Sequence, residues 1–246
     1  MDRMLYVAMN GAKQNMLAQS ANTNNLANVS TTGFRADFAS FRSMPVFGNG
    51  HPTRAYAMAE RPGVNLNPGS LSTTGNPLDI AVDGEGYIAV QAADGSEAYT
   101  RAGNLRRTAA GVLLSSSGEP VLGNGGPISL PPSNNIEIST EGTVSVMSLD
   151  ANDGTLQEID RIKLVNPLPG DLYKGNDGLL RLKDGGQSPA NASVRVVSGA
   201  LETSNVNVTE ALVNMIELAR QFELHVKMMR TADQQAEKVS SLMRLS

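Results

Sequence analysis

The sequence predicts a mainly β protein with α-helical termini, in which a central antiparallel β domain is flanked by N- and C-terminal helices that pair in a coiled-coil-like core. Three observations support this fold class. All twelve prolines of the 246-residue chain lie between Pro45 and Pro189, which leaves both ends free to form long helices. Apolar residues alternate with a period of two between residues 77 and 201, as in short strands. Towards the C-terminus the spacing changes to steps of three and four, as on one face of a helix.

Residues 3–28 are expected to form the first helix. Its polar side consists of Asn, Gln, Ser and Thr, and Lys13 is the only charged residue between Met4 and Phe34. Because Asn is a poor helix former, this helix depends on packing for its stability. The segment 30–35 is expected to stop the helix, with Gly33 in a left-handed conformation. The apolar stripe follows steps of three and four and consists of Leu5, Ala8, Ala12 and Met16.

The middle of the chain divides at residue 77. Residues 43–76 contain four of the prolines and show no clear periodicity, which predicts an irregular connector. From 77 to 201, short alternating segments are separated by glycine-containing turns, and this spacing is typical of an antiparallel sandwich or a barrel-like domain. The expected strands are 78–82, 87–90, 111–114, 120–122, 136–139, 143–147, 161–165, 179–182 and 194–197.

The C-terminal segment is the strongest expected element, a helix from 208 to 245 that would be about 57 Å long. Asn207 and Glu210 form a plausible N-cap pair. A helix of this length cannot pack wholly on a small β domain, so we expect it to need a partner. Its heptad-like stripe restarts after one extra three-residue step. The stripe consists of Val208, Leu212, Met215, Ala219, Phe222, Val226 and Met229, followed by Ala232, Ala236, Val239 and Met243.

Composition excludes several classes of function. The chain has no cysteine and two histidines, His51 and His225, so it offers no thiolate or histidine-built metal site. The formal net charge of -4 provides no basic excess for nucleic acid. No segment approaches the roughly 18 consecutive apolar residues of a membrane span. The longest early apolar run, Met4–Met9, is too short for the apolar region of a cleaved signal peptide, which is about 7 to 15 residues long.

Two short motifs resemble ligand-binding sites, but each lacks a feature that binding of its ligand requires. Residues 84–89 fit the dinucleotide pattern G-x-G-x-x-A, yet the residues after the glycines favour a strand where that motif needs a helix, so we expect a hairpin turn. Residues 150–154 resemble a calcium loop, but the glycine comes one position early and Arg161 stands where the bidentate Glu belongs. Asp79 and Asp83 would lie about 13 Å apart along a strand, too far for an acid–base pair. We therefore expect no catalytic, cofactor or metal site.

Four blocks of sequence resemble one family. Residues 24–35 (NNLANVSTTGFR) resemble the signature of the flagellar rod and hook proteins, and residues 74–87 (TGNPLDIAVDGEGY) resemble the central block of that family. Residues 199–207 (GALETSNVN) resemble the block before its last helix, and Met215 with the stretch 220–223 resembles the helix itself. The resemblance covers nearly the whole chain.

The resemblance implies a structural protein of the bacterial flagellum. Members of this family are exported unfolded by the flagellar type III apparatus, without a cleaved signal peptide. They assemble in the periplasm, with copies of themselves and with other rod proteins, into a tube that transmits torque. The terminal helices line the core of that tube, and the β domain lies outside. The opening residues 1–6 and the modest length resemble a proximal-rod member, with a distal-rod member as the alternative. The alternative from another class is a secreted β-rich enzyme or binding domain.

On this reading the chain divides into an N-terminal assembly helix and turn (1–42), an irregular connector (43–76), a central β domain (77–201) and a C-terminal assembly helix (202–246). The expected assembly interface combines the two helical stripes with the signature residues, and neither a cofactor nor membrane insertion is expected. The interface residues are Leu5, Ala12, Met16, Asn24, Asn25, Leu26, Asn28, Val29, Gly33, Phe34, Val208, Leu212, Met215, Ala219, Phe222, Val226, Met229 and Val239.

Overall fold

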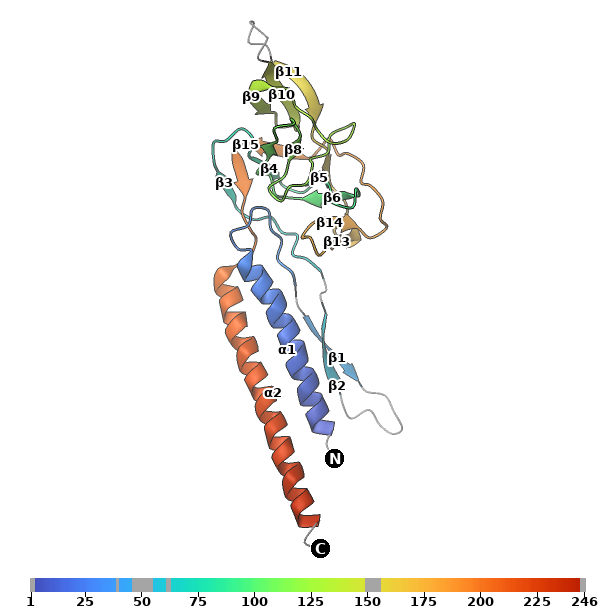
Figure 1. The fold of residues 1–246 in the computed structure, drawn as a ribbon, viewed down its shortest axis with the longest axis vertical. Helices are drawn as coiled ribbons and strands as arrows, with labels where there is room; N and C mark the ends of the chain where they lie inside the picture. The colour runs from blue at the N-terminus through green and yellow to red at the C-terminus, as the bar shows by residue number, and fades with distance from the viewer. Residues whose placement is uncertain (1–2, 39, 46–54, 61–62, 149–155, 244–246) are drawn as a thin grey trace. The chain divides into compact units, whose positions relative to one another are not determined.

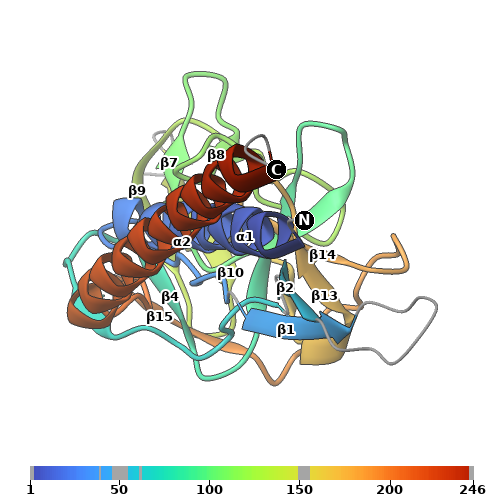
Figure 2. The same ribbon diagram turned by 90° about the horizontal axis from the view of Figure 1, so that it is seen from below.

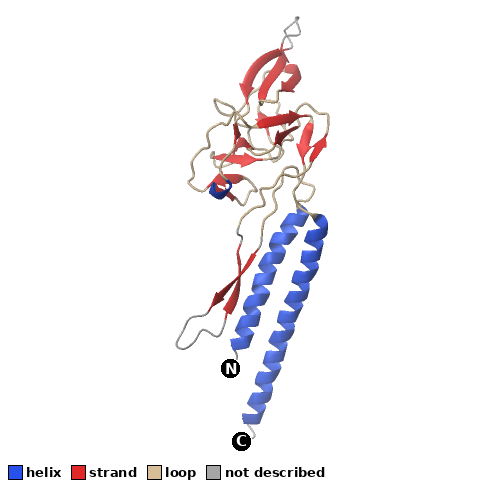
Figure 3. Ribbon diagram, turned by 180° about the vertical axis from the view of Figure 1, so that it is seen from behind, coloured by secondary structure: helices blue, strands red, loops and turns tan. Residues whose placement is uncertain are grey.

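The computed structural model describes residues 3–38, 40–45, 55–60, 63–148 and 156–243 (Figure 1). The chain folds into two compact units. The helical unit contains residues 1–27, 37–63 and 206–246, and the β unit contains residues 28–36 and 64–205. The expectation of a mainly β protein with one helix near each end is confirmed, and Figure 3 shows the helices and strands in separate colours.

The two long helices of the helical unit are α1 (Arg3–Ala27) and α2 (Val208–Met243). Their bounds lie within two residues of those expected from the sequence. The side-chain Oδ1 of Asn207 accepts hydrogen bonds from the backbone N–H groups of Thr209 and Glu210, at 3.1 and 3.3 Å. Asn207 therefore caps the first turn of α2, where the backbone donors have no partner within the helix.

α1 and α2 lie side by side and run in opposite directions (Figure 1), and Figure 2 shows the same two helices from below. The buried positions of α1 are small or polar: Ala8, Gly11, Ala12, Asn15, Ala18 and Ala21. The buried and half-buried positions of α2 include a set spaced by alternating steps of four and three, namely Ala211, Met215, Leu218, Phe222, His225, Met229, Ala232 and Ala236. This set, which we call the α2 seam, places Met, Leu, Phe and His side chains, with an alanine at position 211 and alanines at positions 232 and 236, towards the small residues of α1.

The α2 seam differs from the stripe expected from the sequence. Between residues 208 and 229 the two sets share only Met215, Phe222 and Met229, and the seam continues through Ala232 without the extra three-residue step. Val208 and Leu212 are exposed. The apolar face of α2 is wider than the part of it that α1 covers. The stripe that the heptad spacing selects in the sequence therefore does not coincide with the residues of α2 that contact α1.

A β-hairpin completes the helical unit. β1 (Ser40–Pro45) pairs antiparallel with β2 (Ala55–Glu60), and β2 packs against α1. The side-chain amide of Asn10 donates a 2.7 Å hydrogen bond to the carbonyl of Ala57. The expectation of an irregular segment from 43 to 76 is therefore wrong for these residues and for Leu71–Thr73, which form β3. A two-stranded ribbon has no sheet core of its own and depends on a neighbouring element, so its residues lack the alternation that marks a strand in the sequence.

The β unit contains short antiparallel strands and one 3-10 turn. The five-stranded sheet has the order β12-β5-β6-β14-β13, the three-stranded sheet has the order β11-β10-β9, and the pairs β15-β4, β16-β3 and β7-β8 complete the unit. The elements are β3 (Leu71–Thr73), β4 (Ile80–Asp83), β5 (Tyr87–Gln91), β6 (Glu97–Thr100), β7 (Arg106–Arg107), β8 (Leu113–Leu114), β9 (Ser133–Ile138), β10 (Thr143–Ser148), β11 (Leu156–Arg161), β12 (Leu164–Val165), η1 (Pro169–Asp171), β13 (Leu172–Lys174), β14 (Leu180–Leu182), β15 (Arg195–Ser198) and β16 (Ala200–Glu202).

β5 stands at the centre of the β unit because both of its faces are buried. Ile88 and Val90 belong to the larger apolar cluster, with β4, β10 and β15, whereas Tyr87 and Ala89 belong to a second cluster with Val165. Successive side chains of a strand point to opposite faces, so one strand supplies both clusters. This arrangement explains the nearly continuous apolar sequence of β5.

The turn at residues 84–86 joins strands of different sheets. β4 pairs with β15, whereas β5 pairs with β6 and β12. The expectation of a turn followed by a strand is confirmed, but the expected hairpin between β4 and β5 is wrong. A strand stands where dinucleotide binding needs a helix. Residues 150–154, which resemble a calcium loop, lie outside the described residues.

Within the described parts of the chain, no helix combines the length and the apolar character that a membrane span requires. The same residues contain no group of three or more His, Asp or Glu side chains placed to hold a metal ion.

Gly33 adopts a left-handed conformation with φ of 66°, as expected from the sequence. Its N–H donates a 2.8 Å hydrogen bond to the carbonyl of Glu202. A β-carbon at this position would overlap the backbone of Arg101 and Ala102. Gly33 is therefore required both by its backbone angle and by the close approach of a second chain segment.

We expect Gly33→Ala to destabilise the β unit more than Gly95→Ala. Gly95 also has a positive φ, of 82°, but its β-carbon would meet open space. Both substitutions incur about 1 to 2 kcal/mol for the left-handed conformation, and Gly33→Ala adds an overpacking cost of about 1 to 3 kcal/mol. Urea unfolding followed by circular dichroism measures the difference. Equal losses in the two variants would show that the contact with residues 101 and 102 is unimportant.

Candidate assembly site

Both helices expose apolar side chains that α1 and α2 do not cover for each other. On α2, Leu212 is 45% exposed and Ile216 is 58% exposed. On α1, Tyr6 is 58% exposed and Met16 is 60% exposed. Further exposed apolar side chains on the two helices are Met4, Met9, Leu17, Val208, Val213, Leu224, Met228 and Val239. Monomeric proteins seldom expose so many apolar residues on one pair of elements, so these surfaces indicate contact with other proteins.

The structure divides the expected interface residues into three groups. Those that face the partner helix of the same chain include Ala12, Met215, Phe222 and Met229. Those that remain exposed on the helical unit are Met16, Asn24, Val208, Leu212 and Val239. The half-buried remainder is Leu5, Asn25, Leu26, Ala219 and Val226 in the helical unit, and Asn28, Val29, Gly33 and Phe34 in the β unit.

Several exposed residues were not expected from the sequence. Ile216 and Leu224 lie off the stripe that the heptad spacing selects, and Tyr6, Met9 and Leu17 lie off the stripe of α1. The sequence did contain a signal for them. An amphipathic helix with one partner does not need apolar residues on its other sides, yet both helices carry them there. A wider apolar surface indicates more than one packing partner.

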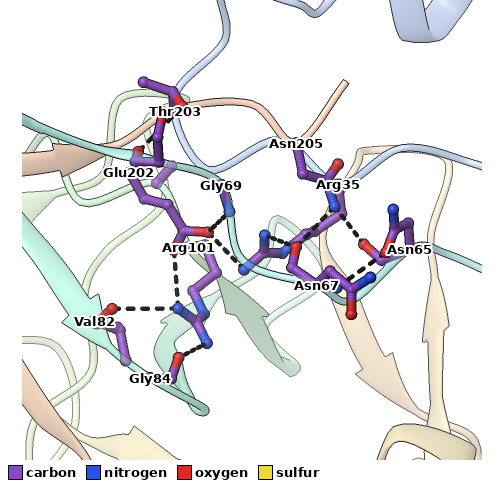
Figure 4. A network of polar contacts seen from close by, with 12 residues as sticks. Arg35, Asn65, Asn67, Gly69, Val82, Gly84, Arg101, Glu202, Thr203 and Asn205 are labelled. Atoms are coloured by element: carbon purple, nitrogen blue, oxygen red, sulfur yellow. Dashed lines mark hydrogen bonds and ion pairs between the residues drawn. The ribbon is translucent and has the colours of Figure 1, made fainter. Parts of the chain in front are cut away.

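The signature segment of the β unit is held by a buried ion cluster (Figure 4). The carboxylate of Glu202 lies 2.7 Å from Nη2 of Arg35 and 2.8 Å from Nη1 of Arg101. All three side chains are at most 3% exposed. The backbone N–H of Gly69 donates a further 2.7 Å hydrogen bond to Oε1 of Glu202. One carboxylate therefore connects three chain segments.

Each arginine is also bound by carbonyl oxygens, which compensates for two cations sharing one anion. Nη2 of Arg101 donates to the carbonyl of Gly84 at 2.7 Å, and its guanidinium lies 5.2 Å from the centre of the Tyr87 ring. Nη1 of Arg35 donates to the carbonyl of Asn67. Burial lowers the pKa of Arg35, and Glu202 opposes that shift. Burial also raises the pKa of Tyr87, so the ring stays neutral beside Arg101.

Asn205 extends the same network. Its Oδ1 accepts a 2.8 Å hydrogen bond from the N–H of Ala36, and its Nδ2 donates to the carbonyls of Asn65 and Asn67. Lys174 donates a 2.7 Å hydrogen bond to the carbonyl of Arg35, and its ammonium lies 4.0 Å from the centre of the Phe34 ring. The charged groups pair with one another, although Nε of Arg35 and Nε of Arg101 are buried without a hydrogen-bond partner among the described residues. This arrangement suits a structural clamp rather than a site that activates a substrate.

Three family descriptions match consecutive parts of the chain. "Flagella basal body rod protein" matches residues 5–35, and "Flagellar hook protein FlgE/F/G D1 domain" matches residues 81–146. "Flagellar basal body rod FlgEFG protein C-terminal" matches residues 197–242. The first match includes most of α1 together with Arg35, and the third match includes most of α2 together with Glu202.

Curated relatives cover the full length. The chain is 38% identical over 252 residues to the flagellar basal-body rod proteins FlgF of Salmonella typhimurium and of Escherichia coli, with 100% of both chains covered in each case. It is 31% identical to the flagellar basal-body rod protein FlgG of Bacillus subtilis, with 98% of this chain and 99% of the relative covered.

We expect Glu202→Gln to reduce the free energy of unfolding of the β unit by about 3 to 5 kcal/mol, because it leaves two arginines buried without their anion. The matched control is Glu141→Gln. Glu141 forms a 2.9 Å ion pair with Arg195, but both side chains are about half exposed, and solvent screening leaves such pairs with little effect on stability. Chemical denaturation of both variants measures the two losses. Similar small losses would refute the role of Glu202 as a clamp.

Proposed function

The chain belongs to the family of flagellar basal-body rod proteins, and on that premise we propose that it joins the rod through the exposed apolar faces of α1 and α2. As a member of this family it is a structural component of the bacterial flagellar basal body rather than an enzyme. The observation that carries the proposal is the apolar surface left uncovered on both helices, with Ile216 of α2 and Leu17 of α1 each more than half exposed. Removing such surface from water favours association by about 25 cal/mol per Å².

The lengths of the helices support contact with more than one neighbour. At 1.5 Å per residue, α1 is about 38 Å long and α2 about 54 Å. α1 therefore cannot cover α2 over its whole length. The α2 seam has the alternating steps of four and three that coiled coils use, so we propose that α1, α2 and neighbouring helices form a coiled-coil-like assembly core. Residues 1–42 and 202–246 would supply this core, and residues 77–201 would lie outside it.

The proposed partners are copies of this chain and other rod proteins. The identity of 38% to the FlgF relatives, against 31% to a FlgG relative, favours a FlgF-like place, which we assign to the proximal part of the periplasmic rod. Long helices packed side by side resist twisting because their interdigitated side chains are poorly compressible. This property suits a shaft that transmits torque.

We further propose the flagellar type III export apparatus as a transient partner, which would pass the chain unfolded and without a cleaved signal peptide. The support is membership of the family. The absence of cysteine is consistent with this route, because folding after export then requires no disulfide bond.

We expect Ile216→Asp to block incorporation into the rod while leaving the purified chain folded. The substitution places a charge on a surface that assembly would remove from water, and an unpaired buried charge is strongly unfavourable. Thermal unfolding of the soluble protein and recovery of motility in a strain lacking the native protein are the two measurements. Asn214→Asp is the control, since it adds the same charge at an exposed polar position of α2.

Phe222→Asp should behave differently from Ile216→Asp. Phe222 lies in the α2 seam, so its replacement is expected to disrupt the pairing of α1 with α2 in the isolated chain.

Full motility with Ile216→Asp would show that the exposed face of α2 around Ile216 does not carry assembly.

A further inference from the structure

One contact between α1 and α2 depends on the absence of a side chain. Gly11 is the only glycine within these two helices, and it is buried. A β-carbon at Gly11 would overlap the imidazole ring of His225, whose Cε1 atom would be nearest to it. Glycine in a helix interior makes the helix less stable than alanine would. The missing side chain leaves space for the imidazole ring of His225, and this packing offsets the loss of helix stability.

The other small residues of α1 do not provide the same space. Both helices repeat their contact positions every seven residues, so a shift by one heptad would preserve most of the apolar pattern. The shift would bring either Ala18 or Met4 opposite His225 in place of Gly11. Both residues carry a β-carbon where the ring lies, and either shifted alignment would overlap it.

The hydrogen bond between the helices excludes only one of the two shifted alignments. The side-chain amide of Asn22 donates a 2.7 Å hydrogen bond to the carbonyl of Ala211. In the shift that brings Met4 opposite His225, Asn15 would occupy the place of Asn22 and could make the same bond. In the opposite shift that place would fall to Val29, beyond the end of α1, and the bond would be lost. In the observed alignment Nδ2 of Asn15 and Nδ1 of His225 are buried and have no hydrogen-bond partner among the described residues. Hydrogen bonding of these atoms therefore does not explain why two polar residues occupy the contact.

We propose that Gly11 and His225 form a register lock that admits only one alignment of α1 and α2. Buried polar residues at helix contacts can fix alignment at some cost in stability, and here the shape of the imidazole and the missing β-carbon do so together. The lock would also fix which exposed residues of the two helices are presented side by side. That consequence rests on the proposed function, whereas the lock itself does not.

A double-mutant cycle on the full chain tests the lock. Gly11→Ala, His225→Ala and the double variant are compared with the parent protein by hydrogen–deuterium exchange of the α1 and α2 amides. With His225 present, Gly11→Ala should accelerate exchange at least fivefold, although alanine is the better helix former. With His225→Ala, the same substitution should slow exchange. A change in the same direction in both backgrounds would overturn the proposal.

A second measurement reads the alignment itself. The chain has no cysteine, so Asn22→Cys with Ala211→Cys introduces a single pair at positions that contact each other in the observed alignment. We expect disulfide formation by a mild oxidant to slow severalfold when Gly11→Ala is added, and to recover when His225→Ala is added as well. An unchanged rate with Gly11→Ala would refute the lock. Neither result depends on incorporation into the rod, which Ile216→Asp tests separately.

Discussion

The β unit depends on a single carboxylate with no access to water. Glu202 is 1% exposed and binds two arginines that lie 66 positions apart, Arg35 and Arg101. A buried cation without a partner is far less stable than one that is paired, so none of the three residues can be removed alone. Through Gly33, Gly69 and Asn205 the same region ties the signature segment to the segment that leads to α2. The backbone of the β unit is thus held by hydrogen bonds both near residue 33, just after α1, and near residue 205, just before α2.

Part of this architecture could be predicted from the sequence because local physical rules determine it. The absence of proline and the steps of three and four located both helices within two residues, and Asn207 marked the start of α2. Gly33 was identified because few residues tolerate a left-handed conformation. Period-two alternation located β4, β9 and β10, whose side chains face an apolar core on at least one side. The short apolar run after the turn at residues 84–86 located β5.

The remainder depends on contacts between distant positions. The hairpin of β1 and β2 lacks alternation because α1, and not a sheet, supports it. The role of Glu202 could not be read from its neighbours, since its partners come from other segments. The contact face of α2 was displaced from the expected stripe because the small residues of α1 cover only part of a wide apolar surface. That mismatch is informative, since the apolar residues left outside the α2 seam form the candidate assembly surface.

A cryo-electron-microscopy map of a rod containing this chain would reveal whether neighbouring subunits complete the outer faces of α1 and α2. We expect Leu212 and Ile216 to be covered by a helix from a neighbouring subunit while His225 stays against Gly11 within the chain. A map in which these two apolar side chains face open space, with subunits joined only through their β units, would contradict this expectation.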